Sequence, residues 1–465
     1  MKRSVLRVAV AVVVSALAGG GAASANGRFP AAQMVVLGPG ARADVIALRT
    51  TFGLIVSTDG GATFRWYCED LLYFPFVPGS GFDPPVEVTA RGEIVVGFED
   101  GAHALTDGCS VRSLGTVLHH DVVDLAATPD GTVIYGAEST AGAPAYVLRS
   151  DDSLFFERRG AGLANVQLLT VEVAPSRPDR VYASGFDDSA ARAPRLFRSD
   201  DGGATLTATG IGAALGDEAF VSGVDPTAPS TLFVRTVDGL ASNLLRSTDG
   251  GDHLARVAGT ADDMTGFAIS DDGRSVWYGS AGAGLFRSTD GGETFARVNA
   301  LPVLGMRWHA GSLWVVTDWL RQPFALGRSD DGGATVRPVL RFSAVLGPPV
   351  CAAPSEGTQV CIDRWSAVST TIADTPRPDA GVARDAAVAP DAPVDAGILD
   401  ASLAGIVDVP TLDAPRTGAS APSTSCGCSV PGATRDVGVE ALSLAMLAAA
   451  TRRRRRRVSI ATGLQ

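Results

Sequence analysis

FRSTDGGETFARV, residues 286–298, recurs along the chain with small changes. Further copies are IVSTDGGATFRWY, FRSDDGGATLTAT, LRSTDGGDHLARV and GRSDDGGATVRPV, which contain Ser57, Ser199, Ser247 and Ser329. Weaker copies begin at Ser150 and near Thr106. Successive copies start about 41 to 49 residues apart, so seven units fill the region from about residue 30 to residue 370.

Each unit combines the recurrent stretch with short β-rich segments. A segment such as VIYGAES (133–139) or SVWYGSA (275–281) comes first, and short strands flank the recurrent stretch itself. A period of 40 to 50 residues with about four strands is typical of a propeller blade. The sequence therefore predicts an all-β fold over residues 26–370, a β-propeller of seven four-stranded blades.

The recurrent stretch has the composition of a turn between two strands. Gly291 and Gly292 tolerate positive φ, and the carboxylate of Asp290 can accept hydrogen bonds from turn amides. The hydroxyl groups close the loop, and Phe295 returns to the core. The predicted turn residues are Ser57, Asp59, Gly61, Thr63, Ser199, Asp201, Gly203, Ser247, Asp249, Gly251, Ser288, Asp290, Gly292, Thr294, Ser329, Asp331 and Gly333.

The pattern S-x-D-x-G-x-T-F/W resembles the Asp box, or BNR repeat, of sialidases, sortilin-type receptors, xyloglucanases and photosystem-assembly propellers. The match is full in the copies at Ser57 and Ser288. It is partial where Leu206, Val336, or His253 with Leu254, replaces the usual residues. The resemblance implies a propeller whose boxes are rim turns away from the central funnel. It implies no activity.

The N-terminus is typical of an exported protein. Lys2, Arg3 and Arg7 precede an apolar run and the small residues of Ala23–Ala25, which predicts a signal peptide over residues 1–25. Removing this segment and everything after Cys428 leaves 29 basic and 48 acidic residues, a net charge near −19. Such a surface repels phosphate backbones, so nucleic acid is not an expected partner.

Four cysteines in the repeat region suit an oxidising compartment. Cys351 and Cys361 flank AAPSEGTQV and are expected to staple a hairpin, and Cys68 and Cys109 are expected to link successive units. A zinc site would need CxxC spacing or nearby histidines, which these cysteines lack. We therefore expect no metal.

The sequence favours a binding module over an enzyme, and it assigns no catalytic residue and no cofactor. A secreted glycoside hydrolase or sialidase-like enzyme on the same fold remains the alternative. Such an enzyme needs two carboxylates across a cleft. Asp187–Asp188, Asp262–Asp263 and Asp318 are candidates that the sequence does not rank, and His119–Asp121 is interpreted as a solvated loop.

Two aromatic clusters could fill the space between blades or contact a ligand. Trp308 and Trp314 are expected to be core residues. For Trp66, Tyr67, Tyr73, Phe74 and Phe76 the sequence leaves core and binding open, because Pro75 and Pro78 indicate a loop.

The C-terminal part has a different composition. Residues 371–425 are rich in Pro, Ala and Asp, which predicts a disordered linker. Residues 426–465 contain Cys426, Cys428, a short apolar helix and six consecutive arginines, and they resemble the MYXO-CTERM sorting signal of myxobacteria. The resemblance implies processing near these cysteines and attachment to the cell surface.

Together these features predict an exported binding or scaffolding module at the surface, or outer membrane, of a Gram-negative, myxobacteria-like bacterium. Its expected partners are a protein or glycan ligand, the membrane through the C-terminal anchor, and the export and sorting machinery.

Overall fold

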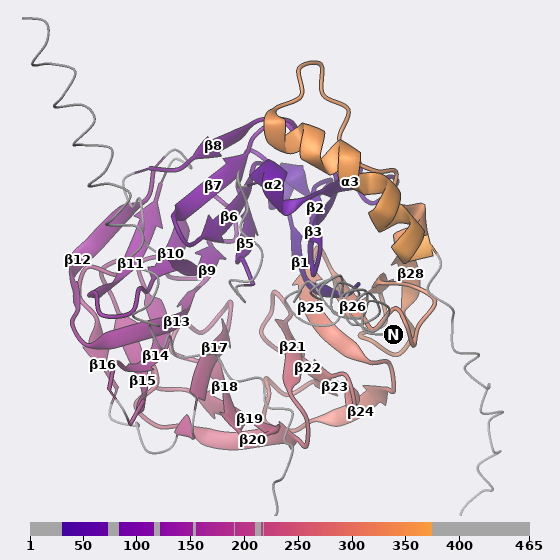
Figure 1. Cartoon of the computed structure of the whole chain (residues 1–465). Coiled ribbons are helices and arrows are strands. Elements are labelled where there is room, and N and C mark those ends of the chain that lie inside the picture. The colour runs from indigo at the N-terminus through magenta and orange to yellow at the C-terminus, as the bar shows by residue number, and fades with distance from the viewer. Residues whose placement is uncertain are drawn as a thin grey trace, which may run out of the picture. The chain divides into compact units, whose positions relative to one another are not determined.

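The structure is a computed structural model that describes residues 30–72, 83–115, 121–151, 155–189, 191–209, 215–216 and 218–373. The strands form seven four-stranded antiparallel sheets. These sheets are arranged in a ring (Figure 1). The chain is a seven-bladed β-propeller, which confirms the predicted fold.

Each blade is built from four strands consecutive in the chain. Blades 1 to 3 contain β1 (Ala32–Leu37), β2 (Ile46–Thr50), β3 (Gly53–Ser57), β4 (Arg65–Tyr67); β5 (Val86–Val88), β6 (Ile94–Phe98), β7 (Gly101–Leu105), β8 (Val111–Ser113); β9 (Val122–Ala127), β10 (Ile134–Glu138), β11 (Ala145–Ser150), β12 (Glu157–Leu163). Blades 4 and 5 contain β13 (Val166–Val173), β14 (Val181–Asp187), β15 (Pro194–Ser199), β16 (Thr207–Ala208); β17 (Glu218–Val224), β18 (Leu232–Asp238), β19 (Ala241–Ser247), β20 (Ala255–Thr260). Blades 6 and 7 contain β21 (Met264–Ile269), β22 (Val276–Ser280), β23 (Gly284–Ser288), β24 (Ala296–Asn299); β25 (Val303–His309), β26 (Ser312–Thr317), β27 (Leu326–Ser329), β28 (Arg337–Leu340). Short helices are η1 (Gly40–Arg42), α2 (Glu69–Leu72) and η3 (Phe342–Ala344), and α3 (Glu356–Ala373) follows the last blade.

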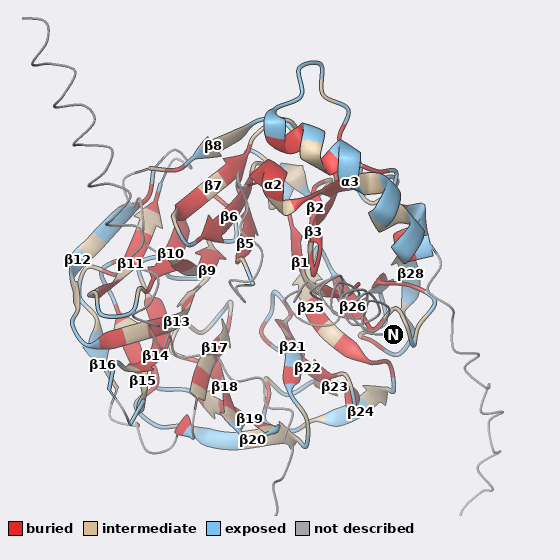
Figure 2. Ribbon diagram, in the orientation of Figure 1, coloured by how far each residue is buried: buried red, intermediate tan, exposed pale blue. Residues whose placement is uncertain are grey.

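Burial decreases from the second strand of a blade to its outer edge. The strands β6, β10 and β22 are buried along their whole length, whereas β24 is exposed or half-buried (Figure 2). Neighbouring blades cover both faces of the second strand, so its apolar residues form the core between blades. The first strand of each blade faces the channel, and polar residues on it therefore reach the centre of the ring.

The recurrent stretch forms the turn between the third and fourth strands in blades 1, 4, 5, 6 and 7. In blade 6, the buried hydroxyl of Ser288 donates to Asp290 Oδ1 (2.6 Å) and accepts from the amide of Gly292 (2.9 Å). The amide of Thr294 donates to the same aspartate oxygen (3.0 Å). Equivalent bonds occur in the other four copies, through Ser57, Ser199, Ser247 and Ser329.

The second glycine of each turn lies against an apolar side chain of the preceding blade. A methyl group on Gly292 would come within 2.5 Å of the Phe233 ring in blade 5. Across the ring closure, a methyl group on Gly61 of blade 1 would lie 3.3 Å from Val339 of blade 7. The turns thus pack against the neighbouring blade as well as reversing the direction of the chain.

The ring closes without strand exchange, because β1–β4 form the whole of the first blade and β25–β28 the whole of the last. A methyl group on Gly305 would lie 2.5 Å from the carbonyl oxygen of Gln33, so the backbones of β25 and β1 approach closely. The indole of Trp319 also donates to the carbonyl of Pro30 (2.9 Å). These contacts join blade 7 to blade 1.

After β28 the chain crosses this closure and runs along the outer edge of blade 1. The amide of Leu346 donates to the carbonyl of Phe64 (3.0 Å), and the amide of Trp66 donates to the carbonyl of Gly347 (2.9 Å). Helix α3 then lies beside α2, and the Trp365 ring packs 5.5 Å from that of Trp66. We refer to residues 341–373 as the C-terminal clasp.

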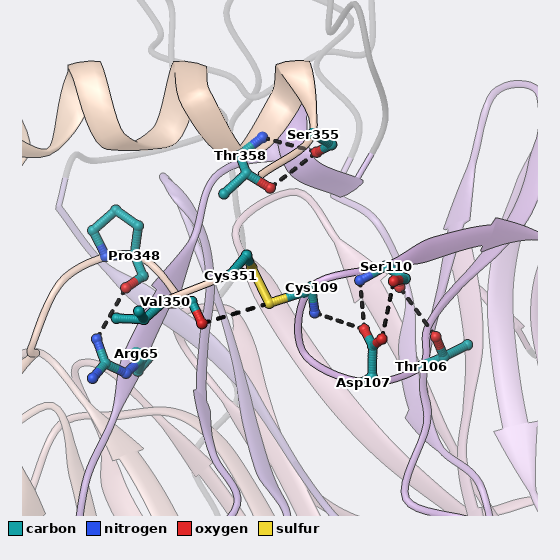
Figure 3. The surroundings of a disulfide bond; sticks show 10 residues. All are labelled: Arg65, Thr106, Asp107, Cys109, Ser110, Pro348, Val350, Cys351, Ser355 and Thr358. Atoms are coloured by element: carbon teal, nitrogen blue, oxygen red, sulfur yellow. Dashed lines mark hydrogen bonds between the residues drawn. A yellow bond between two sulfur atoms is a disulfide. The ribbon is translucent and has the colours of Figure 1, made fainter. Parts of the chain in front are cut away.

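The two disulfides are Cys68–Cys361 and Cys109–Cys351, so both pairings expected from the sequence are wrong. Cys109 lies in the β7–β8 turn, where Asp107 accepts from the Cys109 amide, and Cys351 lies in the clasp (Figure 3). Each bond therefore ties the clasp to an early blade.

The segment from Cys351 to Cys361 is not a hairpin, because helix α3 begins within it. Ser355 Oγ accepts from the amide of Thr358 (3.1 Å) and caps the first turn of the helix. The first turns of α3 separate the two cysteines and turn Cys361 toward Cys68 on blade 1. The pairing of Cys351 with Cys361 was predicted because they are close in the sequence, and that prediction did not take account of the helix cap.

Among the described residues, no helix is both long enough and apolar enough to cross a membrane. The expected signal peptide, almost all of the expected linker, Cys426, Cys428 and the arginine tail lie outside the described residues. Helix α3 extends to Ala373, just past the expected start of the linker at residue 371.

Candidate functional site

The central channel has a volume of about 1410 Å³ and is lined mainly by the innermost strands. Three consecutive blades contribute carboxyl groups: Glu87 from β5, Asp124 from β9 and Glu172 from β13. Arg49 of blade 1 and Arg307 of blade 7 reach the same cavity. Ionisable side chains from five blades therefore converge in the channel.

Both arginines are held by groups in the channel wall. Arg307 Nη1 lies 3.4 Å from Glu87 Oε1, and Glu87 is only 4 % exposed. Arg49 Nη1 donates to the carbonyl oxygens of Asp83 (3.3 Å) and Pro84 (3.2 Å). These contacts orient two cations that burial would otherwise disfavour.

Burial changes the protonation of the carboxyl groups. It raises the pKa of Asp124 to about 7 and the pKa of Glu172 to about 8. The pKa of Glu87 is also raised by burial, and Arg307 opposes that effect. Asp124 Oδ2 accepts from the Val171 amide (2.9 Å). Near neutral pH, Asp124 and Glu172 can therefore donate a proton or accept one.

The other side of the channel is aromatic. Phe220 on β17, Phe267 on β21 and Trp308 on β25 are half-buried and line the cavity. The Arg235 guanidinium lies 4.3 Å above the Phe220 ring and forms an ion pair with Asp263. The channel thus has an acidic side made by blades 2 to 4, and a side made by blades 5 to 7 that combines aromatic rings with charged side chains such as Arg235 and Asp263.

Trp308 is fixed in place by two contacts. Its ring stacks on Trp277 with centroids 5.1 Å apart, and its Nε1 donates to Asp271 Oδ2 (3.1 Å). The adjacent His309 also lines the channel, and burial followed by the charge of Arg307 lowers the pKa of its imidazole. Trp308 can therefore present a preorganised surface to a ligand.

The five aspartates of the recurrent turns, Asp59, Asp201, Asp249, Asp290 and Asp331, are not among the residues that line the channel. Each is engaged within its own turn, as described above. They do not converge on a common cavity.

Only some of the carboxylates that the sequence suggested as candidates lie in the channel. Asp263 and Asp318 line the channel, whereas Asp187, Asp188 and Asp262 do not. Asp187 pairs with Arg195 at 2.6 Å in blade 4, outside the channel.

The aromatic residues of the two clusters also differ in position, some in the core and one on the channel wall. Trp66, Tyr67 and Trp314 are buried core residues. Trp308, which was expected to be core, packs against the core between blades and also lines the channel. Tyr73, Phe74 and Phe76 lie outside the described residues.

Within the described part of the chain, no group of three or more His, Cys, Asp or Glu side chains is arranged to hold a metal ion. His119 and His120 are not described, so the expected solvated loop stays a prediction.

Sequence reasoning missed the acidic side of the channel. The missing signal is a single acid within an apolar strand, in PVEVTA for Glu87, VVDLAA for Asp124 and TVEVAP for Glu172. Each of these acids lies in the first strand of its blade. Because a propeller turns its first strands toward the axis, acids in that position lie near one another.

No protein-family model matches the chain, and no curated protein matches it. Among solved structures, the chain is similar to the GH74 enzyme of Niastella koreensis (15 % identity, TM-score 0.33, covering 65 % of this chain and 62 % of that one). It is also similar to the GH74 xyloglucanase of Xanthomonas campestris (15 %, TM-score 0.33, 71 % and 66 %). Hydrazine synthase of Kuenenia stuttgartiensis is a third (11 %, TM-score 0.44, 64 % and 95 %). The chain spans less than two thirds of the length of either GH74 protein.

Proposed function

We propose that this protein is an exported, surface-attached binding module and that its ligand site is the central channel. The observation that carries the proposal is the convergence of ionisable side chains from five blades in one cavity of about 1410 Å³. Burying such groups costs free energy that an apolar channel would avoid. A purely structural propeller predicts a channel without converging polar groups.

Export is supported by the signal-peptide pattern of residues 1–25 and by the two disulfides, since such bonds persist mainly in oxidising compartments. Surface attachment rests on the sequence of residues 426–465. We also propose that the recurrent turns are Asp boxes, and the shared hydrogen-bond pattern around Asp290 and its counterparts supports this assignment.

A glycoside hydrolase is the second candidate, and the pair Asp124 and Glu172 favours it. Hydrolysis needs one carboxyl that is protonated near neutral pH and a second carboxylate across the scissile bond. A pKa of about 8 suits Glu172 to the role of the acid, and the side chain of Asp124 lines the same cavity. Trp308 could form the sugar-binding surface.

The test uses the full-length protein and compares Glu172→Gln combined with Asp124→Asn against the wild type. Glu157→Gln, an exposed acid on the outer strand β12, is the matched control. Each protein is applied to an array of glycans and envelope proteins, and release of reducing sugar is measured in parallel. Circular dichroism checks that each variant is folded.

A binding module predicts a ligand that the wild type and Glu157→Gln retain and the channel variant loses, without turnover. Sugar release that disappears only in the channel variant would establish the hydrolase instead. Binding that the channel variant retains in full would place the ligand elsewhere and contradict both functions.

Surface attachment has its own test. Cys426→Ala combined with Cys428→Ala is expected to release the protein into the medium or to leave an unprocessed form, detected by cell fractionation and intact mass. Unchanged fractionation and mass would refute this part of the proposal.

A further inference from the structure

The channel wall has two chemically different sides. Blades 2 to 4 contribute Glu87, Asp124 and Glu172, and blades 5 to 7 contribute aromatic rings such as Phe267 and Trp308. A ligand that fills the channel contacts both sides at once. A ligand with a polar group at one end and an apolar body at the other therefore matches the carboxyl groups and the rings together.

The channel already holds one cation between a ring and a carboxylate. Arg235 lies 4.3 Å above the Phe220 ring and pairs with Asp263. A ring face and a carboxylate stabilise a cation together, because the ring presents negative electrostatic potential and the carboxylate a full charge. This internal pair shows which chemistry the channel can accommodate.

The carboxyl groups of Asp124 and Glu172 lack such a partner. Arg307 pairs with Glu87. Arg49 donates to the carbonyl oxygens of Asp83 and Pro84, and its Nη2 lies 4.0 Å from Asp83 Oδ2, so both arginines have other partners. Within the described residues, Glu172 has no hydrogen bond or ion pair, and the hydrogen bond of Asp124 comes from a backbone amide. Two carboxyl groups thus line the cavity without a direct salt bridge, and the charges of Arg49 and Arg307 act on Asp124 and Glu172 only at longer range.

We propose that the channel binds a ligand that carries an ammonium or guanidinium group beside an apolar body. The cation lies between Asp124 and Glu172, and the apolar body packs against Phe267 and Trp308. The proposal rests on the channel being the ligand site and specifies the class of ligand. A small amine and a basic side chain of a peptide share this chemistry, and the cavity of about 1410 Å³ can hold either.

An anionic ligand fits the same wall less well. It would have to displace Glu87 from Arg307 or Asp83 from Arg49, and it would meet the remaining carboxylates. Removing one partner of a buried pair leaves an uncompensated charge and is strongly unfavourable. Charge complementarity therefore favours the cation.

Cation binding is expected to displace protons. Burial raises the pKa of Asp124 to about 7 and of Glu172 to about 8. The charge of Glu87 raises both pKa values and that of Asp124 raises the pKa of Glu172, whereas Arg49 opposes the shift at Asp124 and Arg307 opposes it at Glu172. A bound cation stabilises the ionised carboxylates, so protons leave on binding and affinity rises with pH through this range.

The experiment measures binding of 2-phenylethylammonium, 2-phenylethanol and 3-phenylpropionate to the full-length protein by isothermal titration calorimetry. These probes share a phenyl body and differ in charge. The ammonium is expected to bind best, and its affinity to fall roughly tenfold or more in Asp124→Asn with Glu172→Gln. Glu157→Gln is expected to behave as the wild type. Titration in two buffers of different ionisation enthalpy should reveal proton release.

Equal or tighter binding of the alcohol or the carboxylate would overturn the cation proposal, as would ammonium binding that both channel substitutions leave unchanged. If a neutral or anionic probe binds and the channel variant loses it, the channel remains the ligand site and only the ligand class is wrong. If no probe binds and the array finds no channel-dependent ligand, the proposed function fails as well. Acetyl-Phe-Arg-amide, a peptide probe, distinguishes the two cation sources: binding tighter than that of the small amine indicates a basic peptide.

Discussion

At the scale of single residues, the recurrent turn depends on a buried hydroxyl. Ser288 is 1 % exposed and bonds to both the Asp290 carboxylate and the Gly292 amide. The hydroxyl satisfies a turn amide that has no strand partner. The serine therefore contributes through burial, whereas the aspartate contributes at the solvent-exposed side of the turn.

Ser288→Ala is expected to lower the free energy of unfolding by about 1 to 3 kcal/mol, because the buried amide of Gly292 loses its acceptor. Thr294→Ala removes an exposed contact of the same turn and should change it by less than about 0.5 kcal/mol. Urea denaturation of the full-length protein measures both. Equal effects would show that the buried acceptor is not what stabilises the turn.

The two glycines of the turn make different demands. Gly291 has φ +74° and Gly292 has φ +82°, so alanine is strained at both positions. Only at Gly292 would the new methyl group meet Phe233, at 2.5 Å; the nearest atom to a methyl group at Gly291 is 3.7 Å away.

Gly291→Ala is expected to cost about 1 to 2 kcal/mol from backbone strain alone. Gly292→Ala should cost a further 1 to 3 kcal/mol, roughly, from overpacking the joint between blades 5 and 6. The measurement is the midpoint of denaturation of each variant. A Gly292 variant as stable as the Gly291 variant would mean that the joint relaxes around the methyl group.

At the scale of strands, the first strand of each blade couples the channel to stability. Asp124 and Glu172 keep protons in the folded state that the unfolded chain releases near its ordinary pKa of about 4. The folded state then binds more protons than the unfolded state between about pH 4 and pH 8. Stability therefore falls as pH rises through this interval.

Asp124→Asn and Glu172→Gln are each expected to reduce this fall. Each substitution changes the free energy of unfolding by some amount at pH 4. Near pH 8 that change should be more favourable by on the order of 2 kcal/mol, because the amide never ionises. Denaturation at a series of pH values measures the difference, and Glu157→Gln should show none. A wild-type slope unchanged by both substitutions would show that other groups carry the pH dependence.

The strands also show what the sequence could predict. The spacing of the strong and weak copies of the recurrent stretch was enough for the blade count, because each blade has one connection between its third and fourth strands. The acids of the channel were missed because Glu87 and Asp124 are single polar residues in separate strands and meet only after the ring closes. Trp308 was expected to be core because its sequence does not show which part of the inner strand it occupies. Such a strand contacts the neighbouring blade on one side and the channel on the other, and Trp308 contacts both.

At the scale of the whole repeat region, the first and last blades share no strand. Two disulfides instead connect the segment that follows blade 7 to blades 1 and 2. The clasp leaves blade 7, pairs with the edge of blade 1, and is bonded to blade 1 through Cys68 and to blade 2 through Cys109. The pairings were mispredicted because neighbours in the sequence were joined, whereas the last segment of a ring lies beside the first. The bonds span 293 and 242 residues, so each encloses at least five of the seven blades in the unfolded chain.

Removing both disulfides should lower the free energy of unfolding by more than the sum of the two single removals. With one bond in place, the other closes only a loop of about 50 residues, so Cys68→Ser with Cys361→Ser, or Cys109→Ser with Cys351→Ser, should each cost about 2 to 4 kcal/mol. Removing all four cysteines opens the long loop and should cost more than the sum of the two pairs. Denaturation midpoints give the three values, and hydrogen exchange should accelerate in β1 and β25, where blade 7 meets blade 1. Additive losses with unchanged exchange there would show that packing alone closes the ring, and non-reduced peptides joining Cys68 to Cys109 would contradict the clasp itself.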